Sequence, residues 1–385
     1  MVLIDKIFFD LKRFIFLIKY LFFCRWKFTL PKKNKFILFD GIYNPFLKYL
    51  KKNDFTYLYR RGEEINFIVL LKCLIKFKFS SLDYCAEFIK HVSPKLILTA
   101  FDYHTIFYKL SKKTGIKTLM LQKGKRSKID GIIKDKTYFP ENSKNFFFVD
   151  YVLLYNDFTK SFYSKTIKGN FYTIGSFENN IKKINFSNQK KEIIFVSNYS
   201  CTNDKKSENE DIVAYHLNNL AKKEKIKFNI LPRYRKDKKN LIKEKNFYKR
   251  VFKNKINFIL DKNVTSYNII LKYKYLFATY STLVAEFLAK GGKAGLINFK
   301  SRNNDIYHYS YGAFEGLGKK GTFWCSFNKC NTSEIKRVFN YVLKTNKFTW
   351  FMQNNKNIKK VIDYDKNNSI FLNILKENNI TTKNA

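Results

Sequence analysis

The chain has 385 residues, and its 74 lysines and arginines against 31 aspartates and glutamates give a formal charge of +43. Hydrophobic residues make up 45% of the chain and aromatic residues 18%, which excludes a long disordered basic chain, since such chains are poor in both. The length allows two ordinary domains. The charge predicts an anionic partner, either nucleic acid, a phosphorylated small molecule or an acidic membrane surface. Abundant Asn, Ile and Phe and scarce Gly and Pro indicate that compositional drift also contributes to it.

The first 30 residues predict a basic amphipathic helix. Ile4, Phe8, Leu11, Ile15 and Ile18 recur at three- and four-residue spacing, and lysines and an arginine fall on the other side. Charged residues interrupt every long apolar window, so neither a signal peptide nor a membrane-spanning helix is predicted. Such a helix lies in an anionic membrane interface or packs on its own domain. We expect the former, on the inner face of the cytoplasmic membrane.

Short apolar runs then alternate with helical patterns. Strands are predicted at 36–40, 55–59, 95–101, 117–122, 149–155 and 172–175, and helices at 45–52, 64–79, 82–91 and 156–168, with another ending at Lys113. This alternation is typical of parallel βαβ units. It predicts an N-terminal Rossmann-like domain over residues 35–180.

A polar stretch at 179–192 predicts a linker, after which the alternation begins again. Strands are predicted at 192–196, 227–231, 256–260, 273–279 and 293–298, and helices at 210–223, 238–253, 267–272, 283–289, 333–345 and 368–378. We therefore expect a second Rossmann-like domain over 190–350 and a helical tail over 351–385. The predicted fold is α/β, with two doubly wound domains facing a cleft. Ligands of such sheets bind at the carboxyl ends of the strands.

In the N-terminal half, polar residues follow two predicted strands. Asp102 and His104 follow the strand at 95–101. Asp102 is a candidate general base or a helix cap, and His104 is a candidate anion-binding or acceptor-binding residue. Past the strand at 117–122 comes a candidate anion-binding or acceptor-binding loop, whose residues are Gln122, Lys123, Lys125 and Arg126.

The C-terminal half has three further strand ends of this kind. Ser197 and Asn198 follow its first strand, and Arg233 and Arg235, which could clamp a phosphate, follow its second. Ser281 and Thr282 open a helix, where they could either cap it or border a phosphate site. Glu286 lies one turn further on, within reach of ribose hydroxyls.

Several motifs are missing from the sequence. It has no G-x-G-x-x-G, H-E-x-x-H, G-x-S-x-G or D-x-D motif, which argues against dinucleotide enzymes, zinc proteases, serine hydrolases and manganese-dependent single-domain glycosyltransferases. No Cys pair has zinc-site spacing, so we expect a reduced cytosolic protein with inert thiols and no metal or cofactor. Nucleic-acid-binding motifs are missing too, and no nucleic-acid partner is expected.

Three segments together resemble a known family. "PKLILTAFDYHTIFYKLSKKTGIKTLMLQKGKR", "VDYVLLYNDFTKSFYSKTIKGNFYTIGSFENN" and "ATYSTLVAEFLAKGGKAGLINF" are similar to bacterial surface-carbohydrate (O-antigen) biosynthesis proteins. That family looks like the two-domain GT-B glycosyltransferases, which include Kdo, sialic acid and polysialic acid transferases and polyol-phosphate polymerases. A His-Pro pair often binds the donor phosphate there. Here the stretch reads Leu231-Pro232-Arg233, so an arginine would supply that charge.

The resemblance implies a metal-independent transferase with Asp102 as the base. Its donor nucleotide would bind the C-terminal domain at Ser197, Asn198, Arg233, Arg235, Ser281, Thr282 and Glu286. The donor would be a nucleotide-activated sugar, possibly a CMP-linked acidic sugar, and the acceptor a lipid-linked glycan of lipopolysaccharide or capsule. Two alternatives stay open. One is a glycerol- or ribitol-phosphate transferase on the same fold, and the other is a basic nucleic-acid-binding protein without catalysis.

Overall fold

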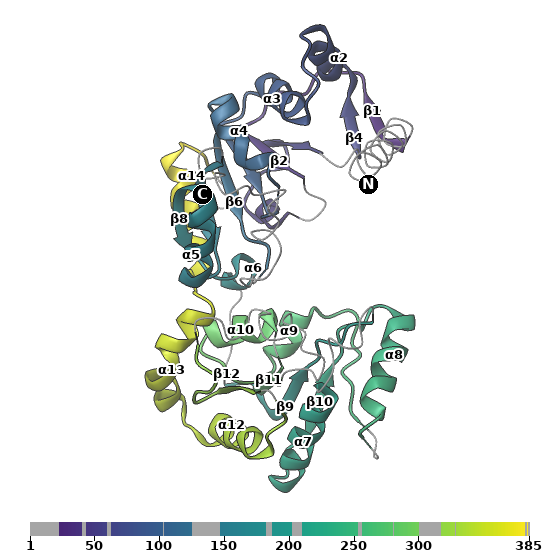
Figure 1. The fold of residues 1–385 in the computed structure, drawn as a ribbon, viewed down its shortest axis with the longest axis vertical. Helices are drawn as coiled ribbons and strands as arrows, with labels where there is room; N and C mark the ends of the chain where they lie inside the picture. Colours follow the sequence, from purple (N-terminus) through teal and green to yellow (C-terminus); the bar gives the residue numbers. More distant parts are fainter. Residues whose placement is uncertain are drawn as a thin grey trace, which may run out of the picture.

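The computed structural model describes residues 23–40, 44–59, 63–102, 104–124, 147–181, 187–201, 210–252, 256–279, 281–299, 317–327, 329–381 and 383. They form two α/β domains that lie one above the other along the long axis of the molecule (Figure 1). Each domain is built on one all-parallel sheet. The predicted fold class is thereby confirmed. The amphipathic helix predicted for the N-terminus falls mostly on residues 1–22, which lie outside the described residues.

The N-terminal sheet has six strands in the order β3-β2-β5-β6-β7-β8. Its strands are β2 (Phe36–Phe39), β3 (Phe55–Leu58), β5 (Leu96–Thr99), β6 (Lys117–Leu121), β7 (Phe148–Leu154) and β8 (Lys168–Thr173). Ile37 and Phe39 of β2 belong to the core on one face, and Phe36 and Leu38 belong to the core on the other. Because both faces are covered, β2 reads as a continuous apolar run instead of an alternating one.

Helices cover both faces of this sheet. They are η1 (Pro45–Lys48), α2 (Phe67–Ile75), α3 (Ser81–Val92), α4 (Phe107–Thr114), α5 (Asp157–Thr166) and α6 (Phe177–Asn180). Side chains of α2 to α5 join one core, and those of η1 and α6 join the other. Helix α2 is shorter than the helix predicted at 64–79, because the first residues of that range form strand β4 (Glu64–Asn66). Asn66 then caps α2 by accepting a hydrogen bond from the Val69 N–H.

The C-terminal sheet has five strands in the order β10-β9-β11-β12-β13, one of the common doubly wound orders. The strands are β9 (Lys190–Val196), β10 (Phe228–Leu231), β11 (Tyr273–Ala278), β12 (Lys293–Phe299) and β13 (Trp324–Phe327). The helices are α7 (Glu210–Lys223), α8 (Lys238–Lys249), α9 (Ser266–Ile270), α10 (Thr282–Ala289) and α12 (Thr332–Lys344). The strand predicted at 256–260 was wrong, since Phe258 forms only an isolated bridge with Ile230.

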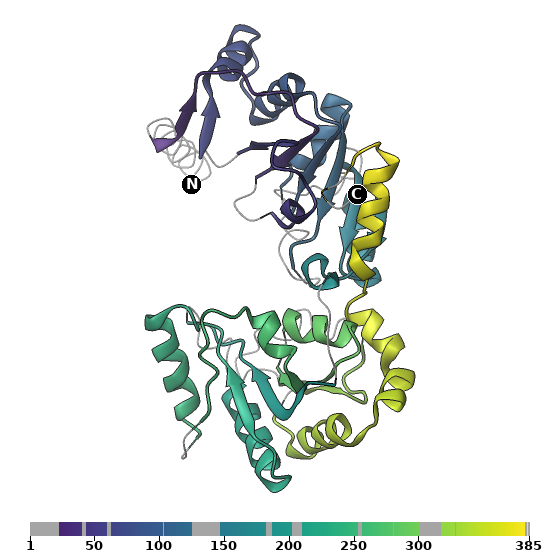
Figure 2. The ribbon, with the colours of Figure 1, turned by 180° about the vertical axis from the view of Figure 1, so that it is seen from behind.

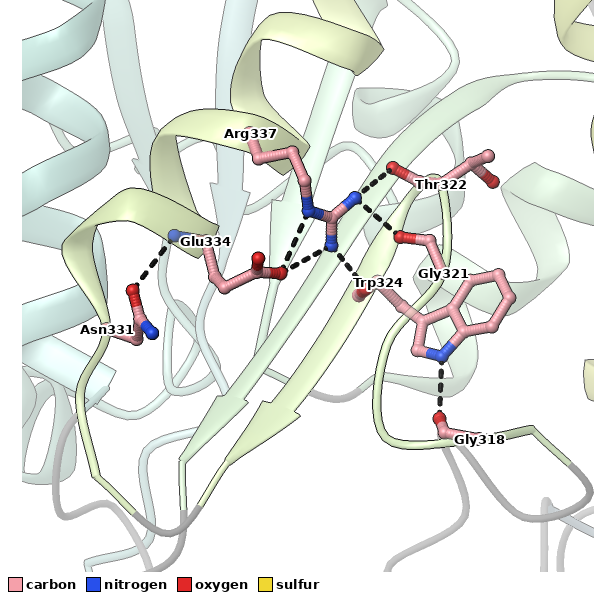
Figure 3. A network of polar contacts seen from close by, with 7 residues as sticks. All are labelled: Gly318, Gly321, Thr322, Trp324, Asn331, Glu334 and Arg337. Atoms are coloured by element: carbon pink, nitrogen blue, oxygen red, sulfur yellow. Dashed lines mark hydrogen bonds and ion pairs between the residues drawn. The ribbon is translucent and has the colours of Figure 1, made fainter.

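One arginine fixes the turn that leads into the edge strand β13. Arg337 of α12 donates hydrogen bonds to the backbone carbonyls of Gly321 at 2.7 Å and Trp324 at 3.2 Å (Figure 3). Glu334, one turn before it, accepts from the Arg337 Nε at 2.8 Å. The Trp324 carbonyl also accepts from the Gly321 N–H at 3.0 Å, so the guanidinium and this backbone bond hold the turn together.

The C-terminal segment, predicted as a helical tail over 351–385, returns to the N-terminal domain. Helix α13 (Lys347–Val361) begins on the C-terminal domain, and η4 (Lys366–Asn368) and α14 (Ser369–Glu377) follow it. Phe371, Ile374 and Leu375 of α14 join the N-terminal core, and α14 lies beside β8 (Figures 1 and 2). At the crossing point Gly175 has a φ of +69°, and a Cβ there would lie 1.8 Å from the Asp363 carbonyl oxygen, so only glycine fits.

A small two-stranded parallel sheet lies apart from the main one. It joins β1 (Arg25–Lys27) to β4, so residues 25–27 are extended where the sequence predicted a helix through residue 30. The Asn66 side chain also donates to the Thr29 carbonyl at 2.6 Å. Figure 1 shows β1, β4 and α2 at the end of the N-terminal domain that faces away from the C-terminal domain.

Candidate functional site

The strand orders define where each sheet opens to receive a ligand. In the C-terminal sheet β9 lies between β10 and β11. The connection from β9 leads to the strand on one side of it, and the connection from β10 leads to the strand on the other side, which leaves a crevice at the carboxyl ends of β9 and β11. Ser197 follows β9 and Ser281 follows β11. In the N-terminal sheet the same relation holds for β2 and β5, which are followed by Asp40 and by Asp102. The topology therefore gathers the predicted residues into two groups.

Glu244 of α8 joins the loops that follow β9 and β10. Its Oε1 accepts from the Ser197 hydroxyl at 2.5 Å and from the Arg233 N–H at 2.9 Å, and its Oε2 accepts from the Tyr234 N–H at 3.0 Å. The side chain is buried, and this burial raises the pKa of the carboxyl group. The Ser197 hydroxyl, predicted to bind a donor, is thus engaged with Glu244.

Glu210 of α7 plays the same role for the ends of β9 and β11. It accepts from the Asn198 N–H at 2.7 Å, from the Tyr248 hydroxyl at 2.6 Å and from the Thr279 hydroxyl at 3.3 Å. Burial raises the pKa of Glu210 to about 7, and the nearby charge of Glu244 acts in the same direction. Sequence reasoning missed both glutamates, because their partners lie far away in the chain.

A cavity of about 610 Å³ lies between the two domains. This volume is within the usual range of small-molecule sites, roughly 300–1,000 Å³. Its walls are formed by Lys48 and Glu178 of the N-terminal domain and by Arg233, Tyr234, Arg235, Lys236, Asp237, Thr265, Ser266 and Tyr267 of the C-terminal domain. Four cationic residues outnumber two acidic ones in this lining, which favours an anionic occupant.

The two predicted arginines have different roles in this cavity. Arg235 is buried, and its guanidinium donates to the Val264 carbonyl at 3.1 Å and to the Ser266 hydroxyl at 2.9 Å. It therefore holds the loop that leads into α9, and burial lowers its pKa. Arg233 is exposed, and its guanidinium donates to the Tyr199 carbonyl at 3.4 Å and lies 5.7 Å from the centre of the Tyr234 ring. Glu244 fixes the Arg233 backbone, and Arg233 is the more exposed of the two arginines that line the cavity.

The start of α10 and its glutamate also differ in role. Ser281 is the N-cap residue, but within the described residues its side chain makes no capping hydrogen bond, and Thr282 opens the helix. Glu286 is buried between the domains, where it accepts from the Ser176 hydroxyl and, at 3.0 Å, from the Tyr267 hydroxyl. Its predicted ribose contact therefore competes with a contact that joins the two domains.

Asp102 lies at the carboxyl end of β5 and is 0% exposed. Its Oδ2 accepts from the Tyr163 hydroxyl at 2.8 Å, and its backbone carbonyl accepts from the Tyr108 hydroxyl at 2.5 Å. It does not cap the helix that follows, because α4 begins after Ile106. The carboxylate is enclosed in this structure, and a direct contact with an acceptor hydroxyl would require a local movement.

His104 pairs with an acidic residue that the sequence did not point to. Its Nε2 contacts the Asp40 carboxylate, and both side chains are buried. Asp40 follows β2, the strand next to β5, and the Phe39 and Phe101 rings lie beside the imidazole. A carboxylate that holds one ring nitrogen of a histidine is an arrangement found in general bases. Only the spatial adjacency of β2 and β5 reveals the pair.

The predicted anion-binding loop after β6 is described in part. The Gln122 side chain donates to the Gly124 carbonyl at 2.7 Å and accepts from the Tyr155 N–H at 2.9 Å, so it joins the ends of β6 and β7. The Lys123 ammonium lies 4.5 Å from the centre of the Phe101 ring. Lys125 and Arg126 lie outside the described residues.

Comparisons with known proteins place this geometry in a family. A family profile described as "putative O-antigen biosynthesis protein" matches residues 119–379, more than half of the chain. The chain belongs to this family. No curated protein sequence matches it.

Solved structures are similar at low sequence identity. HepE of Anabaena, solved in complex with UDP, is 9% identical, covers 89% of this chain and 100% of its own, and superposes with a TM-score of 0.50. A trehalose-phosphate synthase from Burkholderia xenovorans is 9% identical over 90% and 98% of the two chains, with a TM-score of 0.48. MurG of Acinetobacter baumannii is 8% identical, covers 90% of this chain and 100% of its own, and also has a TM-score of 0.48. The fold is the GT-B fold, as the resemblance implied.

The described residues contain no group of three or more His, Cys, Asp or Glu side chains that could hold a metal ion. Within the same ranges, no helix has both the length and the apolar character that crossing a bilayer requires. That the reaction needs no metal ion stays a prediction.

Proposed function

We propose that this protein is a glycosyltransferase of surface-polysaccharide biosynthesis that transfers a sugar from a nucleotide donor to a lipid-linked glycan. The observation that carries the proposal is the cavity between the two domains, which is lined by the exposed Arg233. Membership of an O-antigen biosynthesis family and the GT-B fold support it. Because HepE was solved with UDP, and because the sequence resembles transferases of acidic sugars, UDP- and CMP-linked sugars are the first donors to test.

The donor phosphate would lie near Arg233 and the start of α10. When the acceptor hydroxyl attacks the anomeric carbon, a new carbon–oxygen bond forms and the bond to the phosphate oxygen breaks. Negative charge then grows on the departing nucleotide. The Arg233 guanidinium can bind that phosphate in bidentate fashion, and the N–H groups at the start of α10 add positive potential. Lys48 and Lys236 in the cavity lining strengthen the same field.

A base takes the proton of the attacking hydroxyl. Asp102 is our candidate, at the carboxyl end of β5, and the His104–Asp40 pair beside it is the second. Both are buried in this structure. A base must come within hydrogen-bond reach of the hydroxyl, directly or through one water, so either choice implies that acceptor binding opens this part of the N-terminal domain.

The acceptor would sit at the inner face of the cytoplasmic membrane. A lipid-linked glycan presents its sugar close to the bilayer, and a basic protein is attracted to the anionic lipids there. Residues 1–30, with their basic amphipathic pattern, would strengthen this association. We expect the transfer to need no metal ion and no cofactor.

Thermal-shift screening against CMP, CDP, UDP and GDP, followed by a transfer assay with the matching nucleotide-sugar, tests the proposal. We expect one nucleotide to stabilise the protein and its sugar to be transferred at the same rate with and without EDTA. Transfer of glycerol phosphate or ribitol phosphate from a CDP donor would replace the proposed reaction. Steeply salt-dependent DNA binding without any nucleotide binding would overturn it.

A further inference from the structure

Apolar side chains gather on one projecting part of the N-terminal domain. Of the fifteen large hydrophobic side chains that are exposed in the described part of the chain, nine lie between residues 23 and 79. We use the name β1–α2 surface for seven of them, Phe28, Phe67, Leu71, Leu74, Ile75, Phe77 and Phe79. They lie on α2, on the turn after it and just after β1, at the end of the molecule farthest from the C-terminal domain (Figures 1 and 2).

Helix α2 is apolar on both of its faces. Val69 and Cys73, four residues apart, are buried on the face that packs on the domain. Phe67, Leu71 and Leu74 repeat at spacings of four and three residues and are 41–45% exposed, so they form a second stripe on the solvent side. A surface helix of a soluble domain normally carries polar residues there.

The end of α2 and the turn after it extend this stripe with alternating apolar and basic residues. In Ile75-Lys-Phe-Lys-Phe79 the three apolar side chains are 68%, 83% and 74% exposed. Lys76 and Lys78 separate them, and Lys76 also contacts Glu87 at 3.0 Å. On the other side the Phe28 ring lies 5.5 Å from the Phe67 ring, which connects the turn, the helix and the segment after β1.

We propose that the β1–α2 surface binds an anionic lipid bilayer. Phenylalanine, leucine and isoleucine side chains enter the boundary between head groups and acyl chains, while lysines between them extend their ammonium groups to the lipid phosphates. The core of a protein–protein interface is depleted of lysine, so the exposed Lys78 between the Phe77 and Phe79 rings favours lipid over a protein partner. The surface lies away from the cavity, so a bound membrane leaves the cavity open. The proposal does not depend on the donor or the reaction.

Vesicle flotation of the full chain tests the proposal. The test variant carries Ile75→Ser, Phe77→Ser and Phe79→Ser. The matched control carries Phe348→Ser, Phe351→Ser and Met352→Ser, at positions on α13 that are 76%, 54% and 64% exposed. Vesicles of phosphatidylcholine with and without phosphatidylglycerol are compared. We expect wild type and control to bind the anionic vesicles, and the test variant to bind them at least about tenfold more weakly, with an unchanged melting temperature.

Three results would overturn the proposal. The first is equal vesicle binding by the test and control variants. The second is a wild-type dimer that the test variant loses while its vesicle binding is unchanged, because the surface would then join two copies of the chain. The third is a melting temperature several degrees lower for the test variant alone, because the surface would then be packed within the folded chain. Nucleotide binding, measured in the absence of vesicles, reports separately on the proposed transferase function.

Discussion

Replacing Glu244 by alanine should destabilise the C-terminal domain strongly. The buried carboxylate accepts hydrogen bonds from the Ser197 hydroxyl and from the Arg233 and Tyr234 N–H groups. Each bond contributes about 1 kcal/mol net, and a donor left buried and unpaired costs up to about 3 kcal/mol. The Glu244→Ala variant should therefore lose about 3–5 kcal/mol of unfolding free energy. In Glu244→Gln the amide oxygen still accepts hydrogen bonds but the amide nitrogen cannot, so its loss should be intermediate.

Urea unfolding followed by tryptophan fluorescence measures this loss, since the buried Trp324 and Trp350 report on the C-terminal domain. The exposed Glu377→Ala serves as the control and should change the unfolding free energy by less than about 0.5 kcal/mol. In the folded Glu244→Ala protein, nucleotide affinity should also fall, because the Arg233 backbone loses its anchor. A loss below about 1 kcal/mol would refute the view that Glu244 holds the two loops.

Three further variants test other parts of the site. Glu210→Gln should flatten the pH dependence of stability, because a folded-state pKa of about 7 against an ordinary value of 4.5 makes the wild-type contribution greatest below pH 4.5. That contribution is lost as the pH rises to 7. Denaturation at several pH values should therefore show that the unfolding free energy of the variant, relative to wild type, is about 3 kcal/mol higher at neutral pH than in acid. Asp102→Asn, which can still accept from Tyr163, should fold and lose most sugar transfer; full activity would place the base elsewhere. Ser281→Ala with Thr282→Ala should weaken nucleotide binding by a few-fold in calorimetry, and an unchanged affinity would remove the start of α10 from the site.

The sequence predicted most strands because each parallel strand is buried on both faces and reads as an apolar run. The runs at 36–40 and 95–101 correspond to β2 and β5. The run at 256–260 failed because it pairs through one bridge only, and a short apolar stretch carries no information on its neighbours. Strand β13 was missed, and the helical tail predicted from residue 351 begins four residues late, because aromatic residues at 323–327 and 348–351 fit strand and helix equally well.

The candidate site was predictable only in its location. One loop predicted after a strand does border the cavity, since Arg233 follows β10 and lines it. The distribution of roles among neighbouring residues was not predictable. Arg235 is two positions from Arg233 yet buried in a loop, and His104 pairs with Asp40 from another strand. Such roles depend on contacts between residues far apart in the chain, which a single sequence does not display.

Calorimetric titration of Arg233→Ala with the nucleotide found by screening is the most direct test of the proposed donor site. The control is Arg250→Ala, an exposed arginine at the far end of α8, about 18 Å along that helix from its start. Loss of a charge-assisted phosphate contact should weaken binding by about tenfold or more in Arg233→Ala and leave the control unchanged. Equal affinity of Arg233→Ala and wild type would contradict a nucleotide phosphate bound in the cavity between the domains.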